Sequence, residues 1–205
     1  MPKPGYRKTE LGELPAEWEV VWLENVADLI MGQSPPSSSY NEKQNGLPFF
    51  QGNTEFRNKY PVFPKIYTTK PIKIAKKDDV LISVRAPVGE VNISAFQVCI
   101  GRGLAAIRPH HGSLDKEYLF YWLKKHRVEL ENKSSGSTFK AITKKDLENL
   151  KLPLPPLEEQ KKIAEITAFL LSQALHPVTQ IPGKVYSEMK EMPEDEFTPN
   201  ERKSL

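Results

Sequence analysis

The chain has 205 residues, of which 39% are hydrophobic and 27% are charged, and this suits one ordinary domain with a buried core. No window approaches 18 uninterrupted apolar residues and the start has no apolar signal region, so we expect no membrane span and a cytoplasmic location. The single cysteine, Cys99, excludes an internal disulfide and a cysteine-based zinc site.

The charge is distributed unevenly along the chain. Residues 1–155 carry 23 Lys and Arg against 17 Asp and Glu, whereas residues 156–205 carry 6 against 9. Residues 57–77, the first basic stretch, hold seven basic side chains and no acid, interleaved with aromatic residues. Residues 124–145, the second basic stretch, hold seven against two acids. One such stretch is as often a solvated face as a binding surface, but two in a small domain favour nucleic acid as a partner.

The first part of the chain combines a strand, a helix and a loop in this prediction. Alternating apolar residues over 18–22 indicate a short strand. Apolar residues at i, i+3, i+4 and i+7 from Leu23 predict a helix over 23–32, ended by Gly32 in a left-handed conformation. Residues 33–46 are rich in Ser, Pro and Asn and predict a loop that leads into a strand near residue 47.

The centre of the chain is expected to be rich in strands, and helices follow it. Residues 79–108 contain several apolar runs separated by tight turns, which is typical of a sheet. Residues 114–133 predict a helix capped by Asp115. A second, short helix begins at Thr143, where Asp146 stands in the acidic position of a capping box.

The last predicted helix covers residues 157–175 and is strongly amphipathic. Glu158 and Glu159 lie in its first turn, where the helix dipole favours acids. Either a partner helix or the chain's own domain covers its apolar face. The residues of this face that we expect to form a partner interface are Leu157, Ile163, Ile166 and Leu170. Prolines and an acidic run then indicate an extended or disordered tail.

Enzymatic motifs are incomplete. Residues 34–37 read SPPS, but Ser37 stands where amino-group DNA methyltransferases need an aromatic residue to stack on the flipped base. No Walker or dinucleotide-binding loop is present. Asp78 and Asp79 suit a turn before a strand, and the histidines have no matching ligands around them. We therefore expect no catalytic residue, no metal site and no cofactor.

Five segments of the chain follow one another in a distinctive order. They are GELPAEWEVVWLENVADLIMGQSP, DDVLISVRAPVGEVNIS, GRGLAAIRP, the helix YLFYWL, and SSGSTFKAITKKDLENLKLPLPPLEEQKKIAEI. Their order and spacing resemble the specificity subunits of type I restriction-modification enzymes. The resemblance covers one target-recognition domain and the start of the helix after it.

The resemblance implies an α+β fold, a target-recognition domain with a twisted, mainly antiparallel β-sheet and flanking helices. It implies a non-catalytic subunit that reads one half of a bipartite target in double-stranded DNA, while a modification methyltransferase subunit methylates adenine with S-adenosylmethionine and a restriction subunit cuts. On this basis residues 1–155 are the recognition domain, 156–176 are a truncated spacer or dimerisation helix, and 177–205 are a divergent disordered tail.

A complete specificity subunit resembles two such units in tandem, whereas this sequence shows one. A second copy of the chain or a second specificity fragment is therefore a further expected partner. The alternative is a truncated relic that retains methyltransferase docking but binds DNA weakly. A stand-alone enzyme is a third possibility, which the missing motifs disfavour.

Polar and basic loop residues are the candidates for DNA contact. Arg85 and Arg102 stand beside glycine or proline turns, where a guanidinium group binds phosphate or guanine, or else forms a structural ion pair. Gly101 and Gly103 are expected to permit a tight backbone turn. The predicted DNA-binding residues are Gln33, Ser34, Gln51, Asn53, Arg57, Lys59, Arg85, Arg102, Ser137, Thr138 and Lys140.

Overall fold

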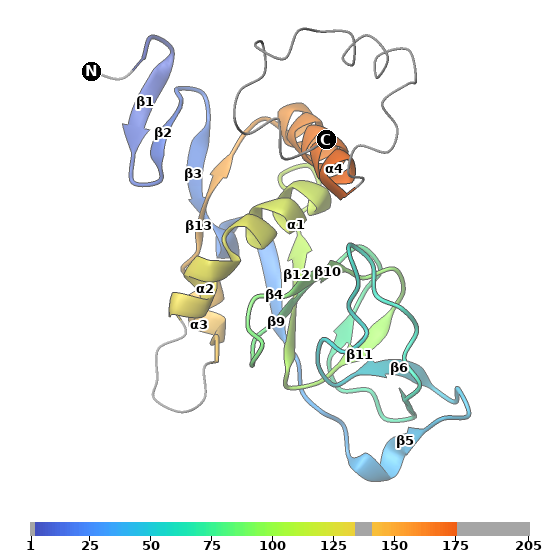
Figure 1. Cartoon of the computed structure of the whole chain (residues 1–205). Coiled ribbons are helices and arrows are strands. Elements are labelled where there is room, and N and C mark those ends of the chain that lie inside the picture. The colour runs from blue at the N-terminus through green and yellow to red at the C-terminus, as the bar shows by residue number, and fades with distance from the viewer. Residues whose placement is uncertain (1–2, 134–140, 176–205) are drawn as a thin grey trace, which may run out of the picture. The chain divides into compact units, whose positions relative to one another are not determined.

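The computed structural model of this chain describes residues 3–133 and 141–175 (Figure 1). One compact unit extends to Ile166, and residues 167–175 belong to a second unit. The described residues form strands and helices in an α+β arrangement, and most strand pairs are antiparallel, as expected. No helix among them is long and apolar enough to cross a membrane.

A four-stranded antiparallel sheet forms the centre of the first unit, and α1 (Lys116–Lys125) packs against it (Figure 1). In sheet order its strands are β10 (Val91–Ile93), β9 (Val80–Ser83), β12 (Leu104–Pro109) and β4 (Ala27–Met31). Side chains that alternate along β9 and β12 enter two different apolar clusters, because successive residues of a strand point to opposite faces. This sheet is therefore buried on both faces.

A five-stranded sheet covers the smaller of these clusters. In sheet order its strands are β5 (Tyr40–Asn41), β7 (Tyr67–Thr68), β6 (Leu47–Phe50), β11 (Val98–Ile100) and β8 (Ile74–Ala75). Only β6 and β11 pair in parallel within the described sheets. Phe50, Val98 and Ile100 from this sheet and Leu104 from β12 are fully buried together. The first basic stretch contains β7 and β8 and thus belongs to this sheet.

Two short sheets complete the strands. β1 (Tyr6–Thr9) and β2 (Gly12–Pro15) form a hairpin, and β3 (Glu19–Trp22) pairs antiparallel with β13 (Lys151–Leu154). Figure 1 shows β3 and β13 side by side. The predicted strand at 18–22 is confirmed, and its partner lies more than a hundred residues along the chain.

The prediction of a helix over residues 23–32 is wrong. A short 3-10 turn, η1 (Leu23–Asn25), is followed by β4, which pairs residue by residue with β12. The apolar spacing suits a helix, but a short apolar run cannot be distinguished from a buried strand by periodicity alone. Here the ladder to β12 decides the conformation, and Gly32 ends a strand rather than a helix.

The helix predicted over 114–133 divides into α1 and α2 (Arg127–Lys133) at His126. The Asp115 carboxylate accepts hydrogen bonds from the backbone N–H groups of Glu117 and Tyr118, each at 2.9 Å, which confirms the predicted cap. The His126 ring stacks on Trp122 at 4.4 Å, and its Nδ1 lies 2.8 Å from the carbonyl oxygen of that residue. These contacts hold His126 outside helical geometry, at φ −93° and ψ 12°.

The two later helices agree with the sequence. α3 (Lys144–Glu148) has the predicted capping box: the Asp146 amide donates to Thr143 Oγ1, and the Thr143 amide donates to Asp146 Oδ2. α4 (Leu157–Leu175) begins at the first unit, where Gln160 is fully buried. Gln160 Oε1 accepts the Asp115 N–H at 2.8 Å, and its Nε2 donates to the carbonyl oxygens of Ser113 and Pro155 at 2.9 Å. These bonds anchor the first turn of α4.

Candidate nucleic-acid interface

Three glycines bring separate segments of the chain together at the end of β4. We call Gly32, Gly101 and Gly103 the glycine junction. A Cβ atom on Gly32 would lie 2.1 Å from the carbonyl oxygen of Gly101, and one on Gly103 would lie 2.8 Å from that of Gln51. Neither distance leaves room for a side chain, so glycine is required here because backbones approach closely.

Backbone hydrogen bonds fasten this junction. The N–H groups of Gly32 and Gln33 donate to the carbonyl oxygens of Leu104 and Ile100, at 2.9 and 3.0 Å. Gly101 donates to the carbonyl oxygen of Phe50 at 2.8 Å. The loops that leave β4, β6 and β11 therefore have fixed positions relative to one another.

The junction gathers polar side chains that the sequence predicts to bind DNA. Gln33, Gln51 and Arg102 are exposed, and Ser34 is half-buried with its Oγ 3.3 Å from the Arg102 backbone nitrogen. Arg85 is exposed and follows Val84, whose N–H donates to the Gly103 carbonyl oxygen at 2.9 Å. We call these residues the junction surface: Gln33, Ser34, Gln51, Arg85 and Arg102.

Neither Arg85 nor Arg102 has a carboxylate partner among the described residues, so the alternative of a structural ion pair does not apply to them there. It applies to Arg108. The Arg108 guanidinium binds both carboxylate oxygens of Asp79, with Nε–Oδ1 at 2.9 Å and Nη2–Oδ2 at 2.8 Å. The hydrogen bond to Asp79 raises the pKa of Arg108 despite partial burial. Asp79 is nearly fully buried, as expected of a charged group only when it is paired.

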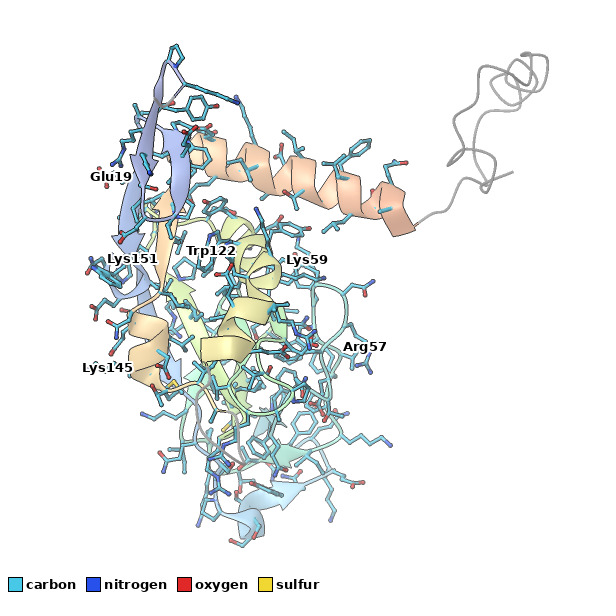
Figure 2. All side chains as sticks on the ribbon, turned by 60° about the vertical axis from the view of Figure 1, so that its left-hand side comes forward. Glu19, Arg57, Lys59, Trp122, Lys145 and Lys151 are labelled. Atoms are coloured by element: carbon cyan, nitrogen blue, oxygen red, sulfur yellow. The ribbon has the colours of Figure 1, made fainter. Side chains whose placement is uncertain are left out.

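Arg57 and Lys59 lie over β10 rather than at the glycine junction. The buried Asn92 side chain accepts the Arg57 N–H at 3.1 Å and donates to the Arg57 carbonyl oxygen at 2.7 Å. The Arg57 guanidinium bonds the carbonyl oxygens of Thr54 and Phe56 in its own loop, and Figure 2 shows this side chain at the edge of the unit. Arg57 is therefore exposed, on a backbone that Asn92 holds.

Lys59 is half-buried and already paired. Its Nζ lies 2.7 Å from Glu117 Oε1 on α1. Burial alone would lower the pKa of Lys59, but the hydrogen bond and charge of Glu117 outweigh it and raise the pKa. Lys59 stays charged, and Glu117 compensates that charge.

Of the remaining predicted DNA contacts, one lies at a described position and three do not. Asn53 is half-buried two residues after Gln51, and its carbonyl oxygen accepts the Phe56 N–H at 3.0 Å. The positions 137, 138 and 140 lie outside the described residues.

The second basic stretch runs from the end of α1 to α3, and two of its cations form ion pairs. Arg127 binds Glu90 and Glu131, and Lys144 binds Glu148 at 2.8 Å. Figure 2 shows Lys145, next along the chain, at the opposite edge of the unit from Arg57. Lys124, at the start of the second stretch, instead approaches the first, because its Nζ lies 3.4 Å from the Asn58 carbonyl oxygen.

The residues expected to contact a partner are divided by the fold. Leu157 and Ile163 are half-buried, and Ile163 packs against the larger apolar cluster of the first unit. Ile166 and Leu170 are each 60% exposed. The prediction missed Phe169, which is 61% exposed on the same helix and which the helical spacing leaves off the expected stripe. In the part of the chain that the structure describes, no group of three or more His, Cys, Asp or Glu residues could hold a metal ion.

Comparison with known proteins identifies the fold. The family model described as the type I restriction modification DNA specificity domain matches residues 15–175. The chain belongs to this family. The match covers the junction surface, the first basic stretch and α4.

Named relatives and solved structures agree with this membership. The chain is 55% identical over 162 residues to a protein of Methanocaldococcus jannaschii named for the MjaX type I restriction enzyme specificity subunit, and covers 38% of it. The HsdS subunit from Thermoanaerobacter tengcongensis is similar with a TM-score of 0.72 and 46% identity, over 83% of this chain and 41% of that chain. A chain from a structure of a type I R-M system reaches a TM-score of 0.74 and 48% identity, over 86% of this chain and 44% of that chain. The chain thus spans about two fifths of the length of these relatives.

Proposed function

We propose that this chain is the non-catalytic, sequence-reading part of a type I restriction-modification complex and that it reads one half of a bipartite target in double-stranded DNA. The observation that carries the proposal is the junction surface. It holds two glutamines and two arginines that have no carboxylate partner among the described residues, next to backbone segments that approach too closely for any residue but glycine. Membership of the DNA specificity domain family supports it.

The chemistry of the junction surface suits base edges in the major groove. A guanidinium group donates two hydrogen bonds to O6 and N7 of guanine, and a glutamine amide pairs in the same way with N6 and N7 of adenine. Exposed cations of the first basic stretch would contribute phosphate contacts, which position the protein without reading sequence. We therefore assign reading to the junction surface and positioning to residues 57–77.

In this proposal catalysis belongs to separate subunits. A modification methyltransferase subunit would dock on this chain, and a restriction subunit would join the complex. The DNA that the complex acts on would place the protein in the cytoplasm. The second candidate, a relic that docks the methyltransferase but binds DNA weakly, is favoured by the exposed Ile166 and Leu170 on α4.

The experiment is selection of bound sequences from a random duplex pool, followed by titration of the selected duplex and its single-base variants. Arg85→Gln and Arg102→Gln should each relax discrimination at one base pair by about 1–3 kcal/mol. Lys145→Gln, which removes an exposed charge on α3, is the matched control and should leave discrimination unchanged.

The outcome also separates the two candidates. Uniform weakening on every duplex would reassign Arg85 and Arg102 to phosphate contacts. The folded chain could bind no duplex even at low salt but still bind a methyltransferase subunit. In that case the proposal that it reads DNA would be wrong, and the interpretation as a relic would be correct.

A further inference from the structure

The first basic stretch exposes apolar side chains that the proposed reading surface does not use. Tyr60, Val62, Phe63 and Ile72 are between 42% and 65% exposed, and Phe63 is the most exposed of them. An exposed phenylalanine forgoes the free energy of burial, so a rigidly held one indicates a ligand that covers it.

The Phe63 ring is held by a ladder of aromatic rings. It stacks on Phe96 with 4.1 Å between centroids and an interplanar angle of 7°. Phe96 contacts the fully buried Phe50 edge-on at 6.0 Å. One face of the Phe63 ring is thus covered by protein, and the ladder ends in the apolar cluster beneath the five-stranded sheet.

The backbone around Phe63 is equally constrained. Pro61 and Pro64 flank the exposed pair and are both buried, and proline fixes its own φ. The N–H of Val62 donates to the Glu55 carbonyl oxygen at 3.0 Å. Binding at Phe63 would therefore cost little conformational entropy, because the ring is already in place.

The stretch of chain that carries Phe63 is positively charged. Arg57, Lys65, Lys70 and Lys73 are exposed and have no carboxylate ion pair among the described residues. The one acid in the preceding loop is Glu55, and burial raises the pKa of its carboxyl group. An aromatic ring among unpaired cations suits a nucleic acid, whose bases stack while its phosphates bind the cations.

We propose that the outer face of Phe63 stacks on a DNA base that is displaced from the duplex, an inference that rests on the proposed function and extends it. Phe96 covers one face of the Phe63 ring, so a single face is left on which a base can stack. Tyr60 does not serve in the same way, because the Lys59 ammonium already lies 5.5 Å from its ring centroid.

The stacking residue and the junction surface share one structural element. The carbonyl oxygen of Phe50, at the buried end of the ring ladder, accepts the Gly101 N–H at 2.8 Å. Gln51 follows Phe50 directly. Packed rings and a backbone hydrogen bond therefore connect Phe63 to the junction surface.

The test compares three DNA probes of one sequence: an intact duplex, the same duplex with one bulged 2-aminopurine, and the single strand that carries it. The wild-type chain should bind the bulged duplex more tightly than the intact one and change the 2-aminopurine fluorescence. Phe63→Leu keeps an apolar contact with Phe96 but removes the aromatic face. In this variant the preference for the bulged over the intact duplex should fall by roughly 5- to 100-fold, and the fluorescence change should disappear.

Matched variants make the result specific. Val62→Ala shortens an exposed apolar neighbour and should retain the preference for the bulge, and Phe63→Trp should retain the fluorescence change. Thermal unfolding of each variant checks that the fold is intact.

Three results would overturn the proposal while leaving DNA reading intact. They are binding to all probes unchanged by Phe63→Leu, equal weakening on the intact and bulged duplexes, and loss only of methyltransferase subunit binding. The absence of wild-type binding to any probe would instead overturn the proposed function itself.

Discussion

The two basic stretches carry the same number of cations but use them differently. In the first stretch, residues 57–77, Lys59 is the cation with an ion pair among the described residues, and most of the others are exposed. In the second, residues 124–145, Arg127 and Lys144 are bound to carboxylates, whereas Lys124, Lys125 and Lys145 are exposed and have no ion pair among the described residues. Charge counted along a sequence is therefore a poor measure of the charge that a fold leaves available.

The secondary structure explains this difference. Arg127 and Lys144 lie on helices and find glutamates four residues later, at Glu131 and Glu148, the spacing at which helix side chains meet. Residues 57–77 are mostly loop and contain no acid. The first stretch is therefore the better candidate for phosphate contacts.

The largest expected effect concerns the ion pair that anchors the end of the first stretch. Asp79 Oδ2 accepts the Lys76 N–H at 2.8 Å, and the same carboxylate binds Arg108. Asp79→Asn leaves Arg108 without its partner charge and should lower the free energy of unfolding by about 3 kcal/mol, measured in urea. Asp78→Asn is the matched control because its pair with Lys116 is exposed, and it should cost under about 1 kcal/mol. Equal losses would show that burial does not distinguish these pairs.

The comparison itself is tested by removing two cations from each stretch. Arg57→Gln with Lys65→Gln should flatten the dependence of log Kd on log salt by about two units, because each lost phosphate contact removes nearly one. Arg127→Gln with Lys144→Gln removes the same charge from paired positions and should leave the slope unchanged. Titration of one duplex at several salt concentrations measures both. Equal changes in slope would remove the distinction between the stretches.

Lys140 belongs to the second stretch but is predicted to bind DNA, so its removal should differ in effect from that of Arg127 and Lys144. Lys140→Glu should weaken binding to all duplexes and reduce the salt slope by roughly one unit. The same titration decides it, with circular dichroism to confirm folding. A slope equal to that of the wild type would exclude Lys140 from the DNA contacts.

A smaller effect is expected at Glu55, the acid beside the first stretch. Burial raises the pKa of this carboxyl group, although a backbone hydrogen bond and Arg57 oppose the shift. A folded pKa above the unfolded one favours folding below the unfolded pKa, and this advantage is lost as pH rises through the folded pKa. Glu55→Gln should therefore flatten the pH dependence of stability over the acid range and slightly strengthen DNA binding. Glu42→Gln, at an exposed acid, should change neither.

Two negative charges introduced on the exposed face of α4 should have the smallest effect, as far as the isolated chain is concerned. Few helical turns bury little area when they pair, so we expect a monomer or weak dimer in isolation. Ile166→Asp with Leu170→Asp should leave its sedimentation unchanged but weaken assembly with a methyltransferase subunit. Sedimentation over a concentration series, with and without that subunit, measures both. A tight dimer that persists at nanomolar concentration in this variant would mean that another surface associates.

Local signals predicted the elements whose stability is local. The Asp115 cap, the Thr143 capping box and the amphipathic period of α4 depend on residues within one or two turns, and all three are confirmed. The apolar runs of β9, β10, β11 and β12 are bounded by turn residues and were also identified as strands.

The family could be identified from the sequence, because five segments in order resemble the specificity subunits and the family model matches residues 15–175. It did not determine the conformation of β4, whose spacing suits a helix until β12 provides a ladder of hydrogen bonds. Nor did it show that Gly32, Gly101 and Gly103 meet, or that Arg108 has an ion pair where Arg102 has none in the part of the chain that the structure describes. These features depend on contacts between residues far apart in the chain, and such contacts leave no local pattern. For that reason the tertiary structure was needed to show which of the loops that carry the predicted polar residues meet.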